Sequence, residues 1–301
     1  MNSLFFLILV LLIVFACSRP FPSRSSSTAG SPSTTASVQN GSMDAQITSG
    51  GVSRHYILHV PTGYRPGAAV PLIINFHGYS SNSKQEEALT GMSAKADRED
   101  FIVAYPDGLN STWYTGPGTD GQQDRQFVRD LIASLEGQYS IDPKRIYATG
   151  ISNGGGMTDR VGCTMADIVA AIAPDSGAYN FWQDCSPSRP MPVLAFHGLD
   201  DKLVPYTGGV PQMMEPPIPD WAAAWTRRDG CASTPVNTTP VNTVTVQTWS
   251  GCQGNAEVIL YTLANLGHSW PGSAVMPKTI TSQAINATDV MWDFFKAHPM
   301  P

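Results

Sequence analysis

The stretch Tyr147-Ala-Thr-Gly-Ile-Ser-Asn-Gly-Gly-Gly-Met157 decides the predicted fold. Its centre, Gly150-Ile-Ser-Asn-Gly154, is a G-x-S-x-G pattern, which is typical of a sharp strand-to-helix turn that exposes a serine nucleophile. Glycines on both sides of Ser152 suit this turn, because chain segments approach there too closely for a Cβ. A helix that begins after Ser152 would offer free N–H groups and the positive end of its dipole to an oxyanion.

The segments around this pattern predict alternating strands and helices. Residues 70–76 form a nearly continuous apolar run, as expected for a strand that is buried on both faces of a parallel sheet. Further strands are predicted at residues 54–60, 101–105, 145–149, 168–173, 193–196 and 258–262, and helices at 85–98, around 127–135 and after Asn286, which can cap the last one. This alternation predicts one catalytic domain, residues 46–301, with a mostly parallel, doubly wound sheet of the α/β-hydrolase type. Ser152 then lies between a strand and a helix.

The N-terminal residues 1–17 are predicted to be a signal peptide. Leu4 to Ala16 is an unbroken apolar run that is short for a membrane span and has the length of a signal-peptide core. Val14-Phe-Ala-Cys17 suits ordinary cleavage after Ala16, and it also resembles a loose lipobox with Cys17 as the lipidated residue; a retained anchor is a third interpretation. Residues 18–45, rich in Ser, Thr, Pro and Gly, are predicted to be a disordered linker. We expect a secreted protein, either free outside the cell or tethered to a membrane through Cys17.

The composition excludes several classes of partner. Among 301 residues, 24 Asp and Glu outnumber 18 Lys and Arg, the formal net charge is −6, and no basic cluster stands out. Nucleic acid is therefore not an expected partner. Neither a C-x-x-C nor an H-E-x-x-H spacing indicates a metal site, and we expect neither a metal nor a cofactor. The protein is expected to be a monomer.

A serine nucleophile needs a base to remove its proton and an acid to orient that base. In an α/β-hydrolase the order along the chain is Ser, then Asp or Glu, then His. That order favours His268, which follows the last predicted strand in a glycine-flanked loop. For the acid, the adjacent Asp200 and Asp201 follow the strand predicted at 193–196, and Asp175 follows the strand before it. Periodicity does not choose between these aspartates.

An oxyanion hole needs two N–H donors near the serine. One is predicted to be the backbone N–H of Asn153, the residue after the nucleophile, and the other that of Tyr79, in the loop after an early strand. Gly78 allows this loop to approach the substrate, and His77 is interpreted as a structural histidine that braces it. Three tryptophans are candidates for substrate contacts or for ordinary packing: Trp113, Trp182 and Trp270.

Four cysteines remain beside Cys17, and four cysteines permit three pairings. In an exported protein disulfides are favoured over free thiols. Proximity in sequence favours Cys163 with Cys185 and Cys231 with Cys252.

Taken together, five segments resemble the secreted poly(3-hydroxybutyrate) depolymerase and feruloyl esterase group, which is similar to carbohydrate esterase family 1. They are residues 71–78, 96–108, 150–157, 192–198 with Val204-Pro-Tyr206, and 267–272. The resemblance implies that the acid is Asp201, the fifth residue of a His-Gly-x-x-Asp pattern, and it matches the pairing of Cys163 with Cys185. The chain departs from the family at Tyr79, where a cysteine is common, but a backbone donor is unaffected by that change.

The resemblance implies a serine esterase that works in two steps through an acyl-enzyme. The expected substrates are feruloyl or acetyl esters of plant polysaccharides, or polyhydroxyalkanoates, with residues 204–219 as a pocket rim. Two alternatives belong to other classes: a serine peptidase on the same fold, and a non-catalytic binding lipoprotein.

Overall fold

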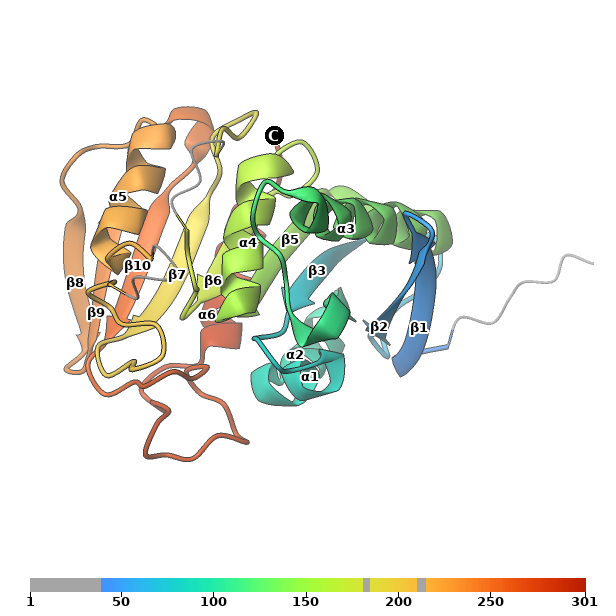
Figure 1. The fold of residues 1–301 in the computed structure, drawn as a ribbon, viewed down its shortest axis with the longest axis horizontal. Coiled ribbons are helices and arrows are strands. Elements are labelled where there is room, and N and C mark those ends of the chain that lie inside the picture. Colours follow the sequence, from blue (N-terminus) through green and yellow to red (C-terminus); the bar gives the residue numbers. More distant parts are fainter. Residues whose placement is uncertain (1–38, 181–184, 210–214) are drawn as a thin grey trace, which may run out of the picture. The chain divides into compact units, whose positions relative to one another are not determined.

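A ten-stranded sheet runs through the part of the chain that the structure, a computed structural model, describes: residues 39–180, 185–209 and 215–301 (Figure 1). The predicted signal peptide, Cys17, most of the predicted linker, Trp182 and the centre of the 204–219 rim lie outside the described residues. Along the sheet the strand order is β1-β2-β4-β3-β5-β6-β7-β10-β9-β8.

The middle of the sheet is parallel, as predicted. Its strands are β4 (Ile102–Pro106), β3 (Val70–Phe76), β5 (Ile141–Ile151), β6 (Ala171–Asp175), β7 (Val193–Gly198) and β10 (Val258–Leu263). Antiparallel strands extend both edges: β1 (Gly41–Ser49) and β2 (Val52–Val60) on one side, and β9 (Val244–Trp249) and β8 (Val236–Val241) on the other. Because the parallel strands point the same way, the loops after them meet at one edge of the sheet, where ligands bind in open α/β folds.

Helices cover both faces of this sheet (Figure 1). The helices on one face are α3 (Thr119–Gln138), α4 (Asn153–Thr164) and α5 (Ile218–Arg228), and those on the other are α2 (Met92–Glu99), which follows α1 (Ser83–Thr90), and α6 (Ala287–Ala297). Within β3, Leu72 and Ile74 pack in the first layer and Ile73 in the second, because successive strand residues point to opposite faces. Both layers are apolar, which explains the continuous hydrophobic run of this strand.

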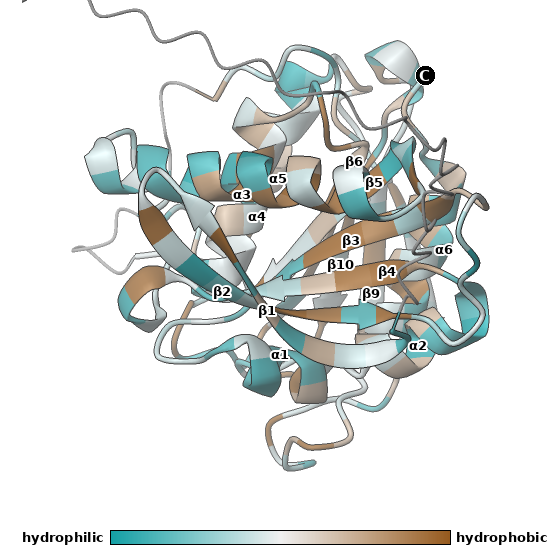
Figure 2. Ribbon diagram, turned by 90° about the vertical axis from the view of Figure 1, so that its right-hand side faces the viewer, coloured by the Kyte–Doolittle hydropathy of each residue, from teal (hydrophilic) through white to brown (hydrophobic). Residues whose placement is uncertain are grey.

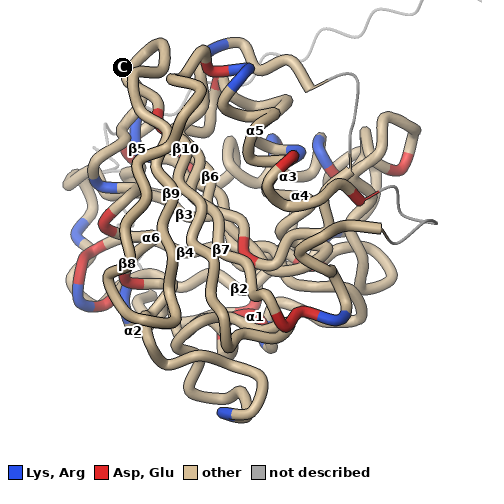
Figure 3. Tube along the Cα trace, turned by 90° about the vertical axis from the view of Figure 1, so that its left-hand side faces the viewer, with Lys and Arg blue, Asp and Glu red and all other residues tan. Residues whose placement is uncertain are grey.

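Polarity follows the same arrangement. In Figure 2 the central strands β3 and β4 are largely hydrophobic, whereas α1 and α3 carry hydrophilic residues on their outer surfaces. In Figure 3 the acidic and basic residues lie mainly around the periphery, with the two signs interspersed, and the central strands carry few charges. This distribution is that of a sheet protein whose charged side chains are solvated.

Most predicted elements differ from the structure by a few residues at their ends, and two differ more. Strand β1 begins at Gly41, inside the predicted linker 18–45, and its exposure alternates along its length because only one of its faces packs on the core. The polar residues of the other face interrupt the apolar pattern, so this strand was not recognised from the sequence. The single helix predicted at 85–98 is two helices, α1 and α2, which meet at Gly91 with a φ of 58°. Glycine adopts this left-handed conformation without steric strain.

Among the remaining strands and helices, some match the sequence prediction and others were not predicted. Strand β3 has the predicted bounds, and the side chain of Asn286 caps α6 by accepting a hydrogen bond from the Asp289 N–H at 3.0 Å. Strand β8 was not predicted, because all its residues are exposed and it carries no buried face. Helix α5 and strand β9 were not predicted either.

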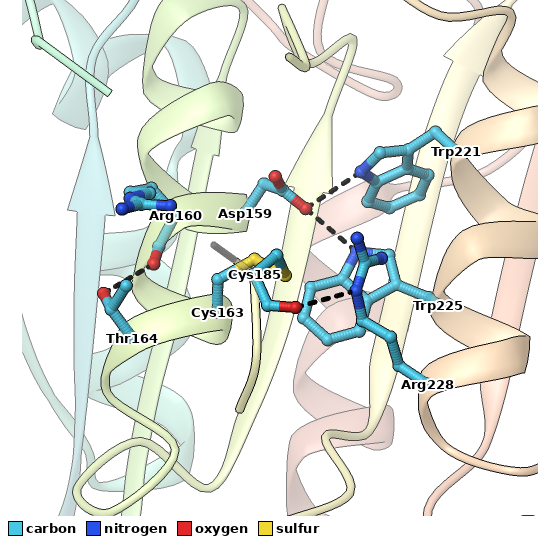
Figure 4. The surroundings of a disulfide bond; sticks show 8 residues. All are labelled: Asp159, Arg160, Cys163, Thr164, Cys185, Trp221, Trp225 and Arg228. Atoms are coloured by element: carbon cyan, nitrogen blue, oxygen red, sulfur yellow. Dashed lines mark hydrogen bonds between the residues drawn. A yellow bond between two sulfur atoms is a disulfide. The ribbon is translucent and has the colours of Figure 1, made fainter. Parts of the chain in front are cut away.

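Both predicted disulfides are present. Cys163, at the end of α4, is bonded to Cys185 (Figure 4), and Cys231 is bonded to Cys252. Next to the first bridge, Oδ1 of Asp159 accepts hydrogen bonds from the indole N–H groups of Trp221 and Trp225, both at 2.9 Å. These contacts join α4 to α5. The bridges span 22 and 21 residues, and on the chain-entropy model each stabilises the fold by about 3 kcal/mol.

Candidate active site

Ser152 lies at the turn between β5 and α4 in a conformation that is rare for a residue with a side chain. Its φ is 59° and its ψ is −122°. The turn is held by its backbone: the N–H of Ser152 donates to the carbonyl of Asp175 at 3.0 Å, and the carbonyl of Ser152 accepts from the N–H groups of Gly156 and Ala178, both at 2.9 Å. Strain of this kind persists only where surrounding contacts fix it, and it is concentrated at functional sites.

The glycines of the pattern are required by space. A Cβ on Gly150 would lie 2.4 Å from the carbonyl oxygen of Phe76, and one on Gly154 would lie 2.1 Å from the same atom. Both distances are far inside van der Waals contact. The strand β3 therefore runs so close to the turn that only glycine fits on either side of Ser152.

His268 and Asp201 meet at the edge of the sheet where parallel strands end. Asp201 follows β7 and His268 follows β10, its parallel neighbour. Nδ1 of His268 lies 2.8 Å from Oδ2 of Asp201. The other carboxylate oxygen, Oδ1, accepts the backbone N–H groups of Leu203 and Val204, both at 2.9 Å. Burial alone would raise the pKa of Asp201, but the hydrogen bond and charge of His268, with the Val204 N–H and the nearby His197, together outweigh it, and the pKa is lowered.

The other two candidate aspartates lie elsewhere. Asp200 is exposed, next to Asp201 in the same loop. Asp175 is buried beneath the turn of Ser152, and its Oδ1 accepts the hydroxyl of Ser176 at 2.8 Å. Burial raises the pKa of Asp175 well above its usual value. Of the three, the structure brings Asp201 to His268.

A second histidine, His197, lies behind Asp201 and was set aside by the chain-order argument. Its Nε2–H donates to the carbonyl of Val204 at 2.8 Å and is 3.6 Å from Oδ2 of Asp201. Burial lowers the pKa of His197 to about 4. It is therefore neutral at physiological pH and fixes the loop that carries Asp201.

The loop predicted to supply an oxyanion donor approaches the serine closely. A Cβ on Gly78 would lie 3.4 Å from the Cβ of Ser152. His77 fixes this loop: its Nε2 accepts the N–H of Gly108 at 3.0 Å, which leaves the proton on Nδ1, and Nδ1–H donates to the carbonyl of Gly78 at 2.7 Å. The N–H of Tyr79 belongs to the same peptide group as this fixed carbonyl. Among the described residues, no acceptor forms a hydrogen bond with this N–H.

The second predicted donor, Asn153, is the first residue of α4, so its N–H has no partner within the helix. Its side chain is fixed against the segment before α3: Oδ1 accepts the N–H of Trp113 at 2.7 Å, and Nδ2 donates to the Trp113 carbonyl at 3.0 Å. Asn153 is thus fixed at both its backbone and its side chain.

These residues line one cavity of about 610 Å³. Ser152, Asn153, His268, Gly78 and Tyr79 all contribute to it. The rest of its wall is mainly apolar and includes Leu89, Ile151, Leu203, Val204 and Met276. Val204 belongs to the predicted pocket rim. Two acidic residues also line the cavity, Glu86 and Glu215. Sequence reasoning missed Glu86, because a glutamate in a polar helical segment is ordinarily solvated.

The predicted tryptophan contacts need correction. The side chains of Trp113 and Trp270 are 2% and 1% exposed, and neither lines this cavity. Trp113 packs against Phe76 in the core and donates its Nε1–H to the carbonyl of His77 at 3.0 Å. Trp270 donates its Nε1–H to Thr288 at 3.1 Å. Both are core residues that support the site from behind, whereas Trp182 lies outside the described residues.

Neither a metal-binding cluster nor a membrane-spanning helix occurs among the described residues. Within residues 39–180, 185–209 and 215–301, no group of three or more His, Cys, Asp or Glu side chains is arranged to hold a metal ion. The helices in the same ranges are all too short or too polar to cross a membrane.

Comparison with known proteins shows that the chain is similar to esterases. Residues 54–201 match the family Esterase PHB depolymerase. Feruloyl esterase B of Piromyces equi is 33% identical over 264 residues, which cover 82% of this chain and 46% of that protein. Poly(3-hydroxyalkanoate) depolymerase C of Paucimonas lemoignei is 35% identical over 127 residues, which cover 40% of this chain and 30% of that protein. The chain thus spans less than half of either relative.

Among solved structures, an acetyl xylan esterase from Aspergillus awamori superposes with a TM-score of 0.63, over 84% of this chain and 99% of that one. At 14% identity this likeness shows the fold, that of an α/β-hydrolase. Residues 54–201 thus contain a domain that matches the family Esterase PHB depolymerase.

Proposed function

We propose that the protein is a carboxylic ester hydrolase in which Ser152, His268 and Asp201 form a catalytic triad. The observation that supports this proposal is the pair of His268 and Asp201, 2.8 Å apart, of which His268 lines the same cavity as Ser152. A carboxylate on Nδ1 holds the imidazole with its Nε2 unprotonated, which is the form that can take a proton from a serine.

The reaction follows from these roles. His268 removes the proton of the Ser152 hydroxyl as Ser152 attacks the ester carbonyl, and the imidazolium that forms is stabilised by Asp201. The N–H groups of Asn153 and Tyr79 bind the oxyanion of the tetrahedral intermediate. His268 then gives its proton to the leaving alcohol, which breaks the ester bond and leaves an acyl-enzyme on Ser152. Water, activated by His268, releases the acid.

The substrate class follows from the relatives. Feruloyl esterase B and the poly(3-hydroxyalkanoate) depolymerase make a feruloyl ester or a polyhydroxyalkanoate the candidate substrates of this chain. An acetylated plant polysaccharide is the third substrate that the sequence predicts. Two disulfides suit an oxidising compartment, which supports secretion. A lipid tether at Cys17 remains part of the proposal.

A release assay tests this function. Purified protein is incubated with methyl ferulate, acetylated xylan and short hydroxybutyrate oligomers, and the acid released is measured for wild type and Ser152→Ala. We expect hydrolysis by wild type and its loss in the variant. Ester hydrolysis that persists in Ser152→Ala contradicts the proposed site. Cleavage of peptides in place of esters would indicate a peptidase, and binding without turnover a non-catalytic lipoprotein.

A further inference from the structure

Two carboxyl groups line the cavity without a role in the steps above, Glu86 in α1 and Glu215 in the loop before α5. The side chain of Glu86 is 1% exposed, and both of its oxygens are buried without a hydrogen-bond partner among the described residues. The same holds for the two oxygens of Glu215. An unpaired buried polar group is costly and needs an explanation in a native structure.

The surroundings of Glu86 favour the neutral carboxylic acid over the carboxylate, because burial without a partner disfavours the charged form. Burial accordingly raises the pKa of Glu86 well above its usual value. Within the described ranges, no lysine, arginine or histidine forms an ion pair with it. A neutral acid offers one O–H donor and a carbonyl acceptor, whereas a carboxylate would only accept.

A hydroxyl group matches this pair of functions, since it also donates once and accepts. We propose that Glu86 is a specificity-determining residue that binds a hydroxyl group on the acyl part of the substrate. This inference rests on the proposed ester hydrolysis at Ser152. It deepens that proposal by distinguishing hydroxyl-bearing acyl groups, such as a phenolic or a 3-hydroxy acid, from a plain acetyl or alkanoyl group.

The neighbours of the two acids separate the acyl side from the alcohol side. Glu215 lies against the loop that follows Asp201, since its carbonyl accepts the N–H of Gly209 at 3.3 Å, whereas Glu86 lies in α1, which follows the loop of Gly78 and Tyr79. Because His268 must protonate the leaving alcohol, the alcohol lies on the side of Glu215. Glu86 is then left to the acyl group. Leu89, in the same helix as Glu86, and Ile151 provide apolar wall for its hydrocarbon part.

The test compares esters that differ in one hydroxyl. The aliphatic pair is ethyl 3-hydroxybutyrate and ethyl butyrate, and the phenolic pair is methyl ferulate and methyl 3-methoxycinnamate. For each pair the ratio of kcat/KM, hydroxyl-bearing over hydroxyl-free, is measured on the full mature protein. We expect a ratio of about ten in at least one pair, because a site built around a hydroxyl rejects the analogue that leaves its polar group unpaired. Which pair shows it identifies the acid.

Variants then assign the preference to Glu86. Glu86→Met should lower the ratio about tenfold, toward one, because methionine has a similar size and cannot pair with a hydroxyl. Glu86→Gln should keep most of it, since an amide also donates and accepts. The matched control is Glu87→Gln: the neighbouring carboxylate accepts the Ser93 hydroxyl at 2.7 Å and does not line the cavity, so the ratio should not change.

Two results overturn the assignment: wild-type ratios near one in both pairs, or a ratio that Glu86→Met leaves unchanged in a protein that melts like wild type. Glu86→Ala serves the same comparison if the methionine variant does not fold. Both results leave ester hydrolysis at Ser152 intact. Failure of the proposed function is recognisable separately, since wild type would then hydrolyse no ester of either pair.

Discussion

Nδ1 of His268 lies 2.8 Å from Oδ2 of Asp201, although 67 residues separate them in sequence. The contact depends on the sheet, since β7 and β10 are parallel neighbours and each carries one of the two residues just beyond its carboxyl end. Backbone N–H groups of Leu203 and Val204 hold the other oxygen of Asp201. The carboxylate of Asp201 is therefore held in one orientation, in which its Oδ2 orients the imidazole of His268.

Replacing Asp201 tests this function with its neighbour as the control. Asp201→Asn should lower kcat by roughly 10³-fold to 10⁴-fold, because an amide N–H facing Nδ1 favours the wrong tautomer of His268. Asp200→Asn, an equal change at the adjacent exposed residue, should leave kcat close to wild type. The measurement is steady-state hydrolysis of p-nitrophenyl acetate. Equal losses in the two variants would be incompatible with the assignment.

His77 should act on catalysis through the oxyanion loop. Burial lowers the pKa of His77, so the ring is neutral and donates only through Nδ1, to Gly78. In His77→Gln this geometry is lost, and we expect kcat to fall at least about tenfold with a smaller change in KM, since an oxyanion hole acts mainly in the transition state. His59→Gln is the control, because His59 bonds Ser42 at 2.8 Å and does not line the cavity. A rise in KM at constant kcat would contradict the positioning role.

The glycines of the chain differ sharply in what they tolerate. Gly154→Ala places a Cβ 2.1 Å from the Phe76 carbonyl oxygen and should abolish activity and lower the melting temperature. Gly137→Ala, in α3 with no atom within 4 Å of the new Cβ, should stabilise the fold by about 0.5–1 kcal/mol, because alanine is the better helix former. Thermal melting of both variants provides the comparison. An active, wild-type-like Gly154→Ala would show that β3 is not in contact with the turn.

Asp229 should give the stability a measurable pH dependence. Burial raises its pKa from 3.8 to about 6. The folded protein therefore keeps a proton that the unfolded chain has lost between those values, and the stability present at pH 4 is lost as the pH rises through about 6. The difference corresponds to about 3 kcal/mol.

Asp229→Asn removes this titration and keeps an acceptor for the Met191 N–H, which bonds Asp229 at 3.0 Å. It should be more stable than wild type at pH 7 and lose that part of the dependence between pH 4 and 6, measured by urea unfolding. Asp293→Asn, at an exposed carboxylate, should follow wild type at every pH. A variant less stable than wild type at pH 7 would refute the assignment.

Local sequence patterns were sufficient to predict a strand where its own residues show a clear apolar run or motif. Strand β3 was predicted to the residue because both its faces are buried. Strand β5 was predicted only in its second half, at 145–149, where it leads into the G-x-S-x-G turn. The alternation of such strands with helices predicted the parallel centre of the sheet, whereas the strand order was not predicted. Strand β8 could not be found, since an exposed edge strand has no apolar period to detect. The adjacent Asp200 and Asp201 were separable only through the family pattern, because spacing places both at the same strand end.

Burial of polar and aromatic side chains depends on the whole fold. Trp113 and Trp270 could have lined a pocket or filled the core, and their core positions depend on contacts with Phe76 and Thr288 that are distant in sequence. Glu86 shows the opposite case, since its helix is polar and only the packed structure places this carboxyl beside the cavity of Ser152. Neither outcome has a local signal.

The most direct test of the account is capture of the acyl group on Ser152. The protein is mixed with a p-nitrophenyl ester, quenched in acid within the first turnover and digested, and the peptide that contains Ser152 is weighed by mass spectrometry. We expect an added acyl mass on this peptide in wild type, together with a burst of p-nitrophenol, and no added mass in Ser152→Ala. Steady hydrolysis with no adduct on Ser152, or an adduct on another residue, would contradict it.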